Sequence, residues 1–309
     1  MLVVKFGGSS VGTAERILAS ARIVAEHQRQ MQVVAVVSAM AGVTDALIQV
    51  ANAALEGYHT WRDDLGKIEQ RHRQAYLHIL GHVPEPFSRA WASVEAAALA
   101  LVEQAFPCED AARQISHFSG WGERLIVDLF VAGLRKEGVP AESFAREPVL
   151  LASQNDEAEP SILATRAWLL PQLAGALAWH AVPVLPGYIA LDAAGEPTTL
   201  GRNGSDHSAA IVAAALGAHA LYIYSDVAGV YTADPRLVAD ARLLPRLSYS
   251  EVAAIAAAGA RVLHPRAVEP LARWGIPLYL RSSFAPAAPG TDIVPLSDEG
   301  RCISAVLPC

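Results

Sequence analysis

The sequence predicts an α/β fold, a three-layer α/β/α sandwich with a mainly parallel central sheet. Short apolar runs such as residues 1–6 and 32–37 are typical of strands buried on both faces. Segments with a helical spacing of apolar residues alternate with these runs, and this alternation favours a parallel sheet covered by helices on both sides. With 309 residues, 52% of them hydrophobic, the chain is long enough to bury a full core.

The first 37 residues predict a strand–loop–helix–strand unit. Residues 1–6 form the first strand, and residues 7–12 form a glycine-rich loop. Apolar residues then recur at helical spacing over residues 13–28, with Thr13 as the expected N-cap. Residues 32–37 form the second strand.

Residues 45–137 contain little strand pattern and predict several helices, divided near Gly57, residues 81–84 and Pro107. We expect this helical insertion to form the lid or outer wall of a substrate site. The expected strands after this insertion cover 139–144, 182–185, 219–224, 277–281 and 302–307, with a hairpin over 188–200. The expected helices cover 161–178, interrupted or kinked at Pro171, then 208–216, 249–258 and 265–274. Residues 147–160 are expected to be a loop, 225–247 an irregular stretch and 285–300 a linker.

Composition excludes several classes of partner. The net charge is −7 at pH 7 and no basic stripe is present, which argues against nucleic acid. No run of eighteen uncharged apolar residues and no signal peptide is found, which argues against a membrane protein. The three cysteines, Cys108, Cys302 and Cys309, lack the spacing of a metal site, and their number fits a reducing cytoplasm.

The stretch Gly201-Arg202-Asn203-Gly204-Ser205-Asp206 joins the expected hairpin to the expected helix over 208–216. Its glycines free the backbone to approach a ligand, and Arg202 offers a planar fork of donors to a carboxylate or phosphate. The helix start behind it favours an anion. Ser205 and Asp206 can cap the helix, and Asp206 can accept from a substrate ammonium group. An ordinary hairpin-to-helix turn explains the same residues equally well.

Lys5-Phe6-Gly7-Gly8-Ser9-Ser10 ends the first strand, at the sheet edge where ligands of open α/β sheets collect. The glycine N–H groups can cradle an anion while Lys5 supplies a charge. The lysine precedes the glycines, so this is not a Walker A loop, and the adjacent glycines exclude GxGxxG. A tight βα turn with a solvated lysine is the alternative.

Two further stretches offer polar groups at helix starts. Residues 38–45 end the second strand in a loop of small residues, with hydroxyls at Ser38 and Thr44 and an expected N-cap at Thr44 or Asp45. Glu123 lies in the first turn of a helix opened by residues 119–122. The helix dipole stabilises a carboxylate there, which can also hold a substrate ammonium group.

Two stretches in the C-terminal third suit a nucleotide. Residues 225–236 follow a buried strand and supply Ser225, Asp226, Tyr231, Asp234 and Arg236 for ring packing, hydroxyl contacts and phosphate charge. Residues 259–266 join two helices. Within them Arg261 can reach phosphates, with a solvated arginine as the alternative. His264 before a proline is extended and is more typical of a structural hydrogen-bonding residue than of an acid or base.

Taken together and in this order, these stretches resemble the aspartate kinases of the amino-acid-kinase family. Lys5-Phe6-Gly7-Gly8-Ser9-Ser10 opens the chain as that family does, and Gly201 to Asp206 resembles the form found in aspartokinase–homoserine dehydrogenase fusions. Residues 225–236 and 262–266 complete the set, so the resemblance spans about residues 1–293. It implies the amino-acid-kinase (carbamate-kinase-like) fold.

The resemblance implies transfer of the ATP γ-phosphoryl group to the side-chain carboxylate of L-aspartate, giving 4-phospho-L-aspartate, the first step of lysine, threonine and methionine biosynthesis. ATP and Mg²⁺ are the implied cofactors. The implied catalytic residues are Lys5, Gly7, Gly8 and Asp206. The implied aspartate-binding residues are Ser38, Thr44, Glu123, Arg202, Asn203, Gly204 and Ser205. The implied nucleotide-binding residues are Ser9, Ser225, Asp226, Tyr231, Asp234, Arg236 and Arg261.

The resemblance also divides the chain. Residues 1–293 are expected to form the catalytic domain, with an aspartate-binding lobe over about 1–200 and a nucleotide-binding lobe over about 201–293. Residues 294–309 are expected to be a linker or the start of a missing regulatory or second domain, so we expect no lysine or threonine feedback through ACT domains in this chain. A homodimer and a fusion to a second catalytic domain both fit the resemblance, as does a cytoplasmic location.

Two positions depart from the family pattern. Arg261 stands where the family has lysine, which keeps the charge and changes its geometry. Ser225 stands where threonine is common. The alternatives to an aspartate kinase are a related enzyme with another acceptor and a catalytically impaired domain that binds nucleotide as a scaffold.

Overall fold

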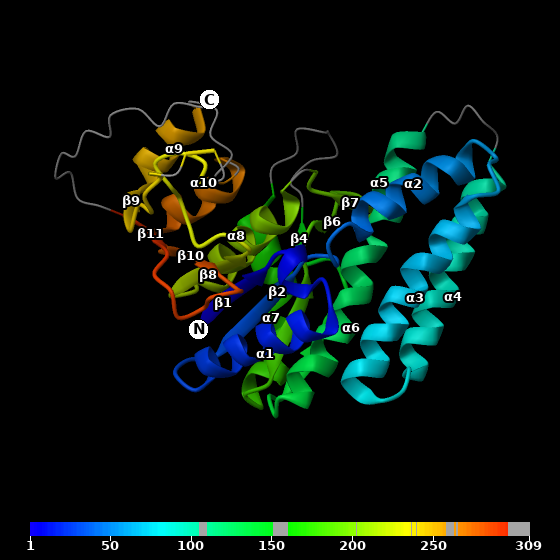
Figure 1. Ribbon diagram of the computed structural model, residues 1–309, viewed down its shortest axis with the longest axis horizontal. Coiled ribbons are helices and arrows are strands. Elements are labelled where there is room, and N and C mark those ends of the chain that lie inside the picture. Colours follow the sequence, from blue (N-terminus) through cyan, green and yellow to red (C-terminus); the bar gives the residue numbers. More distant parts are fainter. Residues whose placement is uncertain are drawn as a thin grey trace.

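A computed structural model describes residues 1–104, 110–150, 160–201, 203–235, 237–238, 240–257, 263 and 265–295 (Figure 1). Its main sheet has eight strands in the order β3-β5-β2-β1-β8-β10-β11-β9. These strands are β1 (Leu2–Phe6), β2 (Val33–Val37), β3 (Ala141–Ser143), β5 (Val182–Pro186), β8 (Ala220–Ser225), β9 (Arg246–Ser248), β10 (Leu278–Ser282) and β11 (Thr291–Val294). Neighbouring strands are parallel except β10 and β11. The predicted mainly parallel sheet is therefore confirmed.

Helices cover both faces of the sheet. The described helices are α1 (Ala14–Gln28), α2 (Val43–Leu55), α3 (Trp61–Leu80), α4 (Glu85–Val102), α5 (Ala111–Ser119), α6 (Trp121–Lys136), α7 (Ile162–Ala178), α8 (Gly204–Leu216), α9 (Tyr249–Ala257) and α10 (Pro265–Trp274). Helices α1 to α4 and α6 share one hydrophobic cluster, and α7 to α10 share the other. Strand residues alternate between the clusters: Val4 and Phe6 contribute to the first, Val3 to the second. The predicted three-layer sandwich is confirmed.

The helical insertion expected over residues 45–137 is present as α2 to α6. Figure 1 shows α2 to α5 gathered on one side of the molecule, opposite α9, α10 and β9. The expected hairpin is also present: β6 (Ile189–Leu191) pairs antiparallel with β7 (Pro197–Thr199), and β4 (Val149–Leu150) joins them in a small second sheet. None of the helices in the described part of the chain combines the length and apolar character needed to cross a membrane.

Three predicted helix starts can be compared with the structure. Thr13 caps α1 as predicted, since its Oγ1 accepts from the Arg16 N–H at 3.3 Å. The expected cap at Thr44 or Asp45 is wrong, because α2 begins at Val43 behind Gly42, whose φ of 78° only glycine adopts readily. The expected start at 208 is also wrong, because α8 begins at Gly204 behind a left-handed Asn203 with φ 59°.

Other differences concern α7 and the C-terminal region. Helix α7 runs through Pro171 without the predicted interruption. The linker expected over 285–300 is wrong for Thr291–Val294, which pairs with β10 and β9 as β11. Thr291 and Ile293 are buried there, a period-2 pattern that the surrounding prolines and glycines obscure in the sequence. The strand expected over 302–307 lies outside the described residues.

Candidate active site

The loops that the sequence analysis singled out meet at one edge of the sheet. The register aligns Phe6 at the end of β1 with Val37 of β2 on one side and Tyr224 of β8 on the other. Each of these strands is followed directly by one of the predicted ligand-binding loops. Because parallel strands end at the same edge, residues 7–12, 38–42 and 225–235 lie next to one another.

Lys5 and Asp206 form the charged pair at this edge. Lys5 is on β1 and only 7% exposed, and its Nζ lies 2.5 Å from Oδ1 of Asp206. Asp206 lies in the first turn of α8, where the positive end of the helix dipole also favours a carboxylate. The capping role expected for Ser205 and Asp206 is therefore wrong, since both are inside the helix. Asp206 instead orients Lys5.

The glycine loop after β1 is held tightly against the loop after β2. The Gly7 N–H donates to the Tyr224 carbonyl at 3.0 Å, so this amide continues the sheet and the expectation that it cradles an anion is wrong. Gly8 opens a short 3₁₀-helix (Gly8–Val11), where the first N–H groups have no intrahelical acceptor. A Cβ on Gly8 would lie 2.8 Å from the Ala39 carbonyl oxygen, so only glycine fits.

Glu123 brings a carboxylate from α6 to the same loop. Its side chain is 3% exposed, and Oε1 accepts from the Ala39 N–H at 3.2 Å. No hydrogen-bond partner of Oε2 is found among the described residues. Burial raises the pKa of Glu123 to about 8, although the Ala39 and Glu123 N–H groups and Lys5 act in the opposite direction. This buried oxygen suits a cationic ligand group.

The other described aspartate-binding candidates lie at the end of β2, in the first turn of α2 and around the start of α8. Ser38 and Thr44 are half-buried, at the end of β2 and in the first turn of α2. Ser205 is buried against Gly187. A Cβ added to Gly187 would lie 2.7 Å from the Ser205 Cβ. Gly204 is buried against Tyr188 and Leu200, whereas Asn203 is exposed at the left-handed turn that precedes α8.

The predicted nucleotide loop begins at Ser225, whose hydroxyl accepts from the Val227 N–H at 3.3 Å. Asp226 is exposed. Tyr231 is half-buried and forms an isolated β-bridge with Leu243. The Asp234 carbonyl accepts hydrogen bonds from the N–H groups of Leu237 and Val238. Ser9 is half-buried in the glycine loop. Of the predicted site residues, Arg202, Arg236 and Arg261 lie outside the described residues, as does His264.

Sequence reasoning missed the residues that fasten this loop. Thr291 on β11 is fully buried; its Oγ1 accepts from the Val230 N–H at 2.8 Å and donates to the Leu244 carbonyl at 2.7 Å. Ser283 donates to the Ser225 carbonyl at 3.0 Å and lies 2.7 Å from the Ser10 hydroxyl. Thr291 lies in the region expected to be a linker and Ser283 just before it, and neither residue gave a sequence signal of these contacts.

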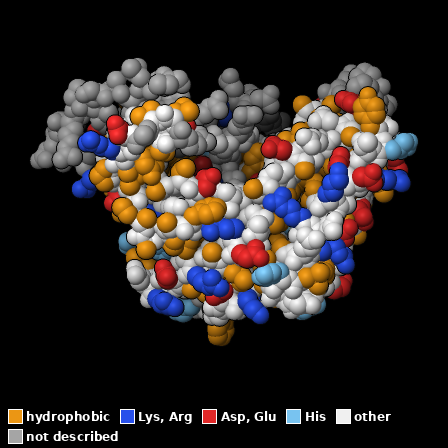
Figure 2. Space-filling model, in the orientation of Figure 1, with side chains coloured by type: hydrophobic (Ala, Val, Ile, Leu, Met, Phe, Trp, Pro, Cys, Tyr) orange, Lys and Arg blue, Asp and Glu red, His pale blue; other side chains and the backbone are white. Residues whose placement is uncertain are grey.

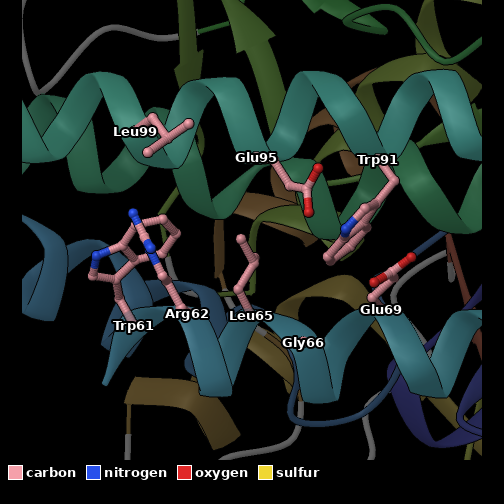
Figure 3. Close-up of a pocket in the computed structure, with 8 residues that line it drawn as sticks. All are labelled: Trp61, Arg62, Leu65, Gly66, Glu69, Trp91, Glu95 and Leu99. Atoms are coloured by element: carbon pink, nitrogen blue, oxygen red, sulfur yellow. The ribbon is translucent and has the colours of Figure 1, made fainter. Parts of the chain in front are cut away.

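A groove lies away from this edge of the sheet. It has a volume of about 350 Å³ between α3 and α4, and none of the predicted site residues lines it. Figure 3 shows Glu69 of α3 and Glu95 of α4 on either side of Trp91, with Arg62 beside Trp61. Over the face shown in Figure 2, acidic and basic side chains are interspersed, and no continuous basic stripe crosses it.

The fold and the sheet-edge site together define a class of protein. The model of the amino acid kinase family matches residues 1–282, and the chain belongs to this family. A UMP kinase from Bacillus anthracis shares the fold with a TM-score of 0.55 at 13% identity.

Within the family, the chain is similar to aspartokinases. It is 31% identical to the aspartokinase of Rickettsia felis over 292 residues, covering 94% of this chain and 60% of the relative. It is 31% identical to the bifunctional aspartokinase/homoserine dehydrogenase of Haemophilus influenzae over 315 residues, covering 95% of this chain and 36% of the relative. A crystal structure of E. coli aspartokinase III in complex with aspartate and ADP matches with a TM-score of 0.84 at 31% identity, covering 97% of this chain and 65% of that one. The chain therefore spans less than two thirds of the length of these aspartokinases.

Proposed function

We propose that this chain is an aspartate kinase catalytic domain, which transfers the γ-phosphoryl group of ATP to the side-chain carboxylate of L-aspartate. The observation that carries the proposal is the buried Glu123 carboxylate beside the Lys5–Asp206 pair and the Gly8 loop. An acceptor for an ammonium group is thereby placed next to a cation and a bare amide. The aspartate and ADP bound by the similar E. coli enzyme support the same substrates.

In this proposal Lys5 and the Gly8 N–H neutralise charge on the phosphoryl group as it moves from ATP to aspartate. Asp206 keeps the Lys5 ammonium group at one position. Glu123 in its ionised form accepts hydrogen bonds from the α-ammonium group of aspartate. The attacking carboxylate is already ionised at neutral pH, so no residue has to remove a proton. Catalysis then rests on positioning and electrostatics.

Mg²⁺ belongs to the same proposal. No group of three His, Cys, Asp or Glu side chains able to hold a metal is found among the described residues. In this proposal the cation is carried mainly by the phosphate oxygens of ATP, which is how Mg²⁺ usually reaches phosphoryl-transfer sites. When bound, Mg²⁺ would neutralise phosphate charge. The exposed Asp226 carboxylate, at the start of the nucleotide loop, is the residue that would approach it.

We also propose that the two lobes bind different substrates. Residues before Gly201 supply Ser38, Thr44 and Glu123 for aspartate, and the loop over 225–235 supplies the nucleotide contacts. A cytoplasmic location and a homodimer complete the proposal.

The test is ADP release from MgATP with a panel of acceptors that includes L-aspartate, L-glutamate, carbamate and UMP. We expect turnover that depends on L-aspartate. Turnover only with another acceptor would assign the chain to a different activity of the family. Nucleotide binding without turnover with any acceptor would indicate a scaffold domain.

A further inference from the structure

Arg71 joins the two loops that form the phosphoryl side of the site. It lies in the middle of α3, on the helical insertion, and its guanidinium makes two hydrogen bonds to backbone carbonyls. Nη1 donates to the Ala41 carbonyl at 2.7 Å, and Nη2 donates to the Gly12 carbonyl at 3.0 Å. Gly12 ends the loop after β1, and Ala41 belongs to the loop after β2.

These two loops carry the groups assigned above to phosphoryl transfer and to aspartate. The Ala41 N–H donates to the Gly8 carbonyl at 3.1 Å, and Gly8 packs against the Ala39 carbonyl. The Ala39 N–H in turn holds Glu123. A short series of contacts therefore leads from Arg71 to the Gly8 amide on one side and to the Glu123 carboxylate on the other.

The chemistry of arginine suits this position. A planar guanidinium presents parallel N–H groups that can reach two carbonyls at once, whereas a lysine ammonium group acts as a single point donor on a flexible stem. No acidic side chain among the described residues forms an ion pair with Arg71. Its hydrogen-bonding capacity is thus directed to the loops.

Arg73 provides a contrast on the same helix. Its Nη1 pairs with Glu69 Oε1 at 3.2 Å, one turn away, and Glu69 lines the groove between α3 and α4 (Figure 3). Two arginines two residues apart on one helix therefore face different surroundings. One holds the site loops, and the other makes an exposed pair typical of a solvated helix face.

We propose that Arg71 is a positioning residue of the phosphoryl-transfer site, which fixes the glycine loop and the loop after β2 relative to each other. Only the expected effect of Arg71 on kcat rests on the proposed function. This role of Arg71 adds α3 to the elements of the helical insertion that support the site, since α6 of the same insertion already supplies Glu123.

The test compares Arg71→Met, Arg71→Lys and the matched control Arg73→Met in the full chain. We expect Arg71→Met to lower kcat with aspartate and MgATP by about 10- to 100-fold, since small displacements of reacting groups cost that much. The KM for aspartate should rise by less than kcat falls, because Glu123 itself stays on α6. Arg71→Lys should recover part of kcat, and Arg73→Met should match the wild type.

Amide hydrogen exchange provides the readout independent of turnover. In Arg71→Met, peptides covering residues 7–13 and 38–44 should exchange faster, while the strands of the sheet exchange as in the wild type. Loss of kcat together with uniformly faster exchange would show a merely structural role and overturn the proposal. A kcat within twofold of wild type would overturn it too. If the wild type itself does not phosphorylate aspartate, the proposed function fails, whereas the exchange comparison still decides whether Arg71 holds the loops.

Discussion

The Lys5 ammonium group is the only positive side chain in the described part of the site that contacts Asp206. Replacing Lys5 with alanine removes the charge that is proposed to face the phosphoryl group, and we expect kcat to fall by a few powers of ten, or roughly 3–4 kcal/mol. Steady-state kinetics with aspartate and MgATP measures this loss. Lys67→Ala, which removes an exposed lysine paired with Asp64, is the control and should keep full activity. An unchanged kcat in Lys5→Ala would show that the phosphoryl site is elsewhere.

If Glu123 binds aspartate as proposed, the binding should depend on pH. With its pKa near 8, the side chain is mostly protonated at pH 6 and cannot accept an ammonium group well. We expect the KM for aspartate to rise about tenfold for each unit that pH falls below 8, because only the ionised form binds. In Glu123→Gln the KM should be high and independent of pH between 6 and 8. A wild-type KM that is flat over this range would contradict the assignment.

The same group links stability to pH. Its folded-state pKa is raised from 4.5, so the folded chain holds the proton more tightly than the unfolded chain. The resulting stabilisation is fully present below about pH 4.5 and is lost as pH rises towards 8. Urea unfolding should show Glu123→Gln gaining stability relative to wild type over this interval, by at most about 1.4 kcal/mol per pH unit. A stability difference that does not change over this interval would mean that Glu123 is already ionised in the folded chain.

At the scale of single residues, the sequence placed Glu123 in the first turn of a helix and Lys5 at the end of a strand, and both positions are confirmed. The partners of these residues could not be predicted. Ala39 binds Glu123 through its backbone N–H. Every residue except proline has such a group, so the sequence does not show which one binds. The pairing of Lys5 with Asp206 spans 201 positions and depends on α8 starting four residues earlier than its apolar pattern suggests.

Strand β11 acts on the nucleotide loop through one hydroxyl. Thr291→Val removes the group that bonds both the Val230 N–H and the Leu244 carbonyl, leaving a buried N–H and a partly buried carbonyl without this partner. We expect the free energy of unfolding to fall by about 2–3 kcal/mol and the KM for ATP to rise, because the loop is no longer fastened. Urea unfolding and kinetics measure the two effects.

Thr232→Val is the control for this substitution. Thr232 is exposed, and its hydroxyl accepts from the Arg242 N–H at 3.0 Å in the same loop. Water can replace that bond, so the change in stability should stay below about 1 kcal/mol. Equal losses in both variants would show that β11 has no special part in holding the loop.

Elements with a strong local pattern were predicted well, and a strand that depends on tertiary pairing was not. Helix α1 and strands β1 and β2 agree with the sequence analysis within a residue at each end, because long helical spacing and apolar runs dominate there. Strand β11 was missed because four residues between proline- and glycine-rich segments carry too little pattern. Its existence depends on pairing with β10 and β9, a tertiary contact that local sequence does not encode.

Over the whole molecule, the proposed lobes share one sheet. Strand β1 pairs with β2 on one side and with β8 on the other, so neither half closes a sheet alone. We expect one cooperative unfolding transition, with circular dichroism and tryptophan fluorescence coinciding. ADP at 100 times its Kd should shift the whole transition by about 2.7 kcal/mol. Two separate transitions, or a shift of only one, would show that the lobes fold independently.

The outermost strands, β3 and β9, have three residues each. Edge strands this short offer few unpaired backbone groups to a neighbouring chain, so a second molecule can hardly extend the sheet. The protein should therefore form no fibrils at high concentration, even though its interior is built from valine-rich segments that would aggregate readily if exposed.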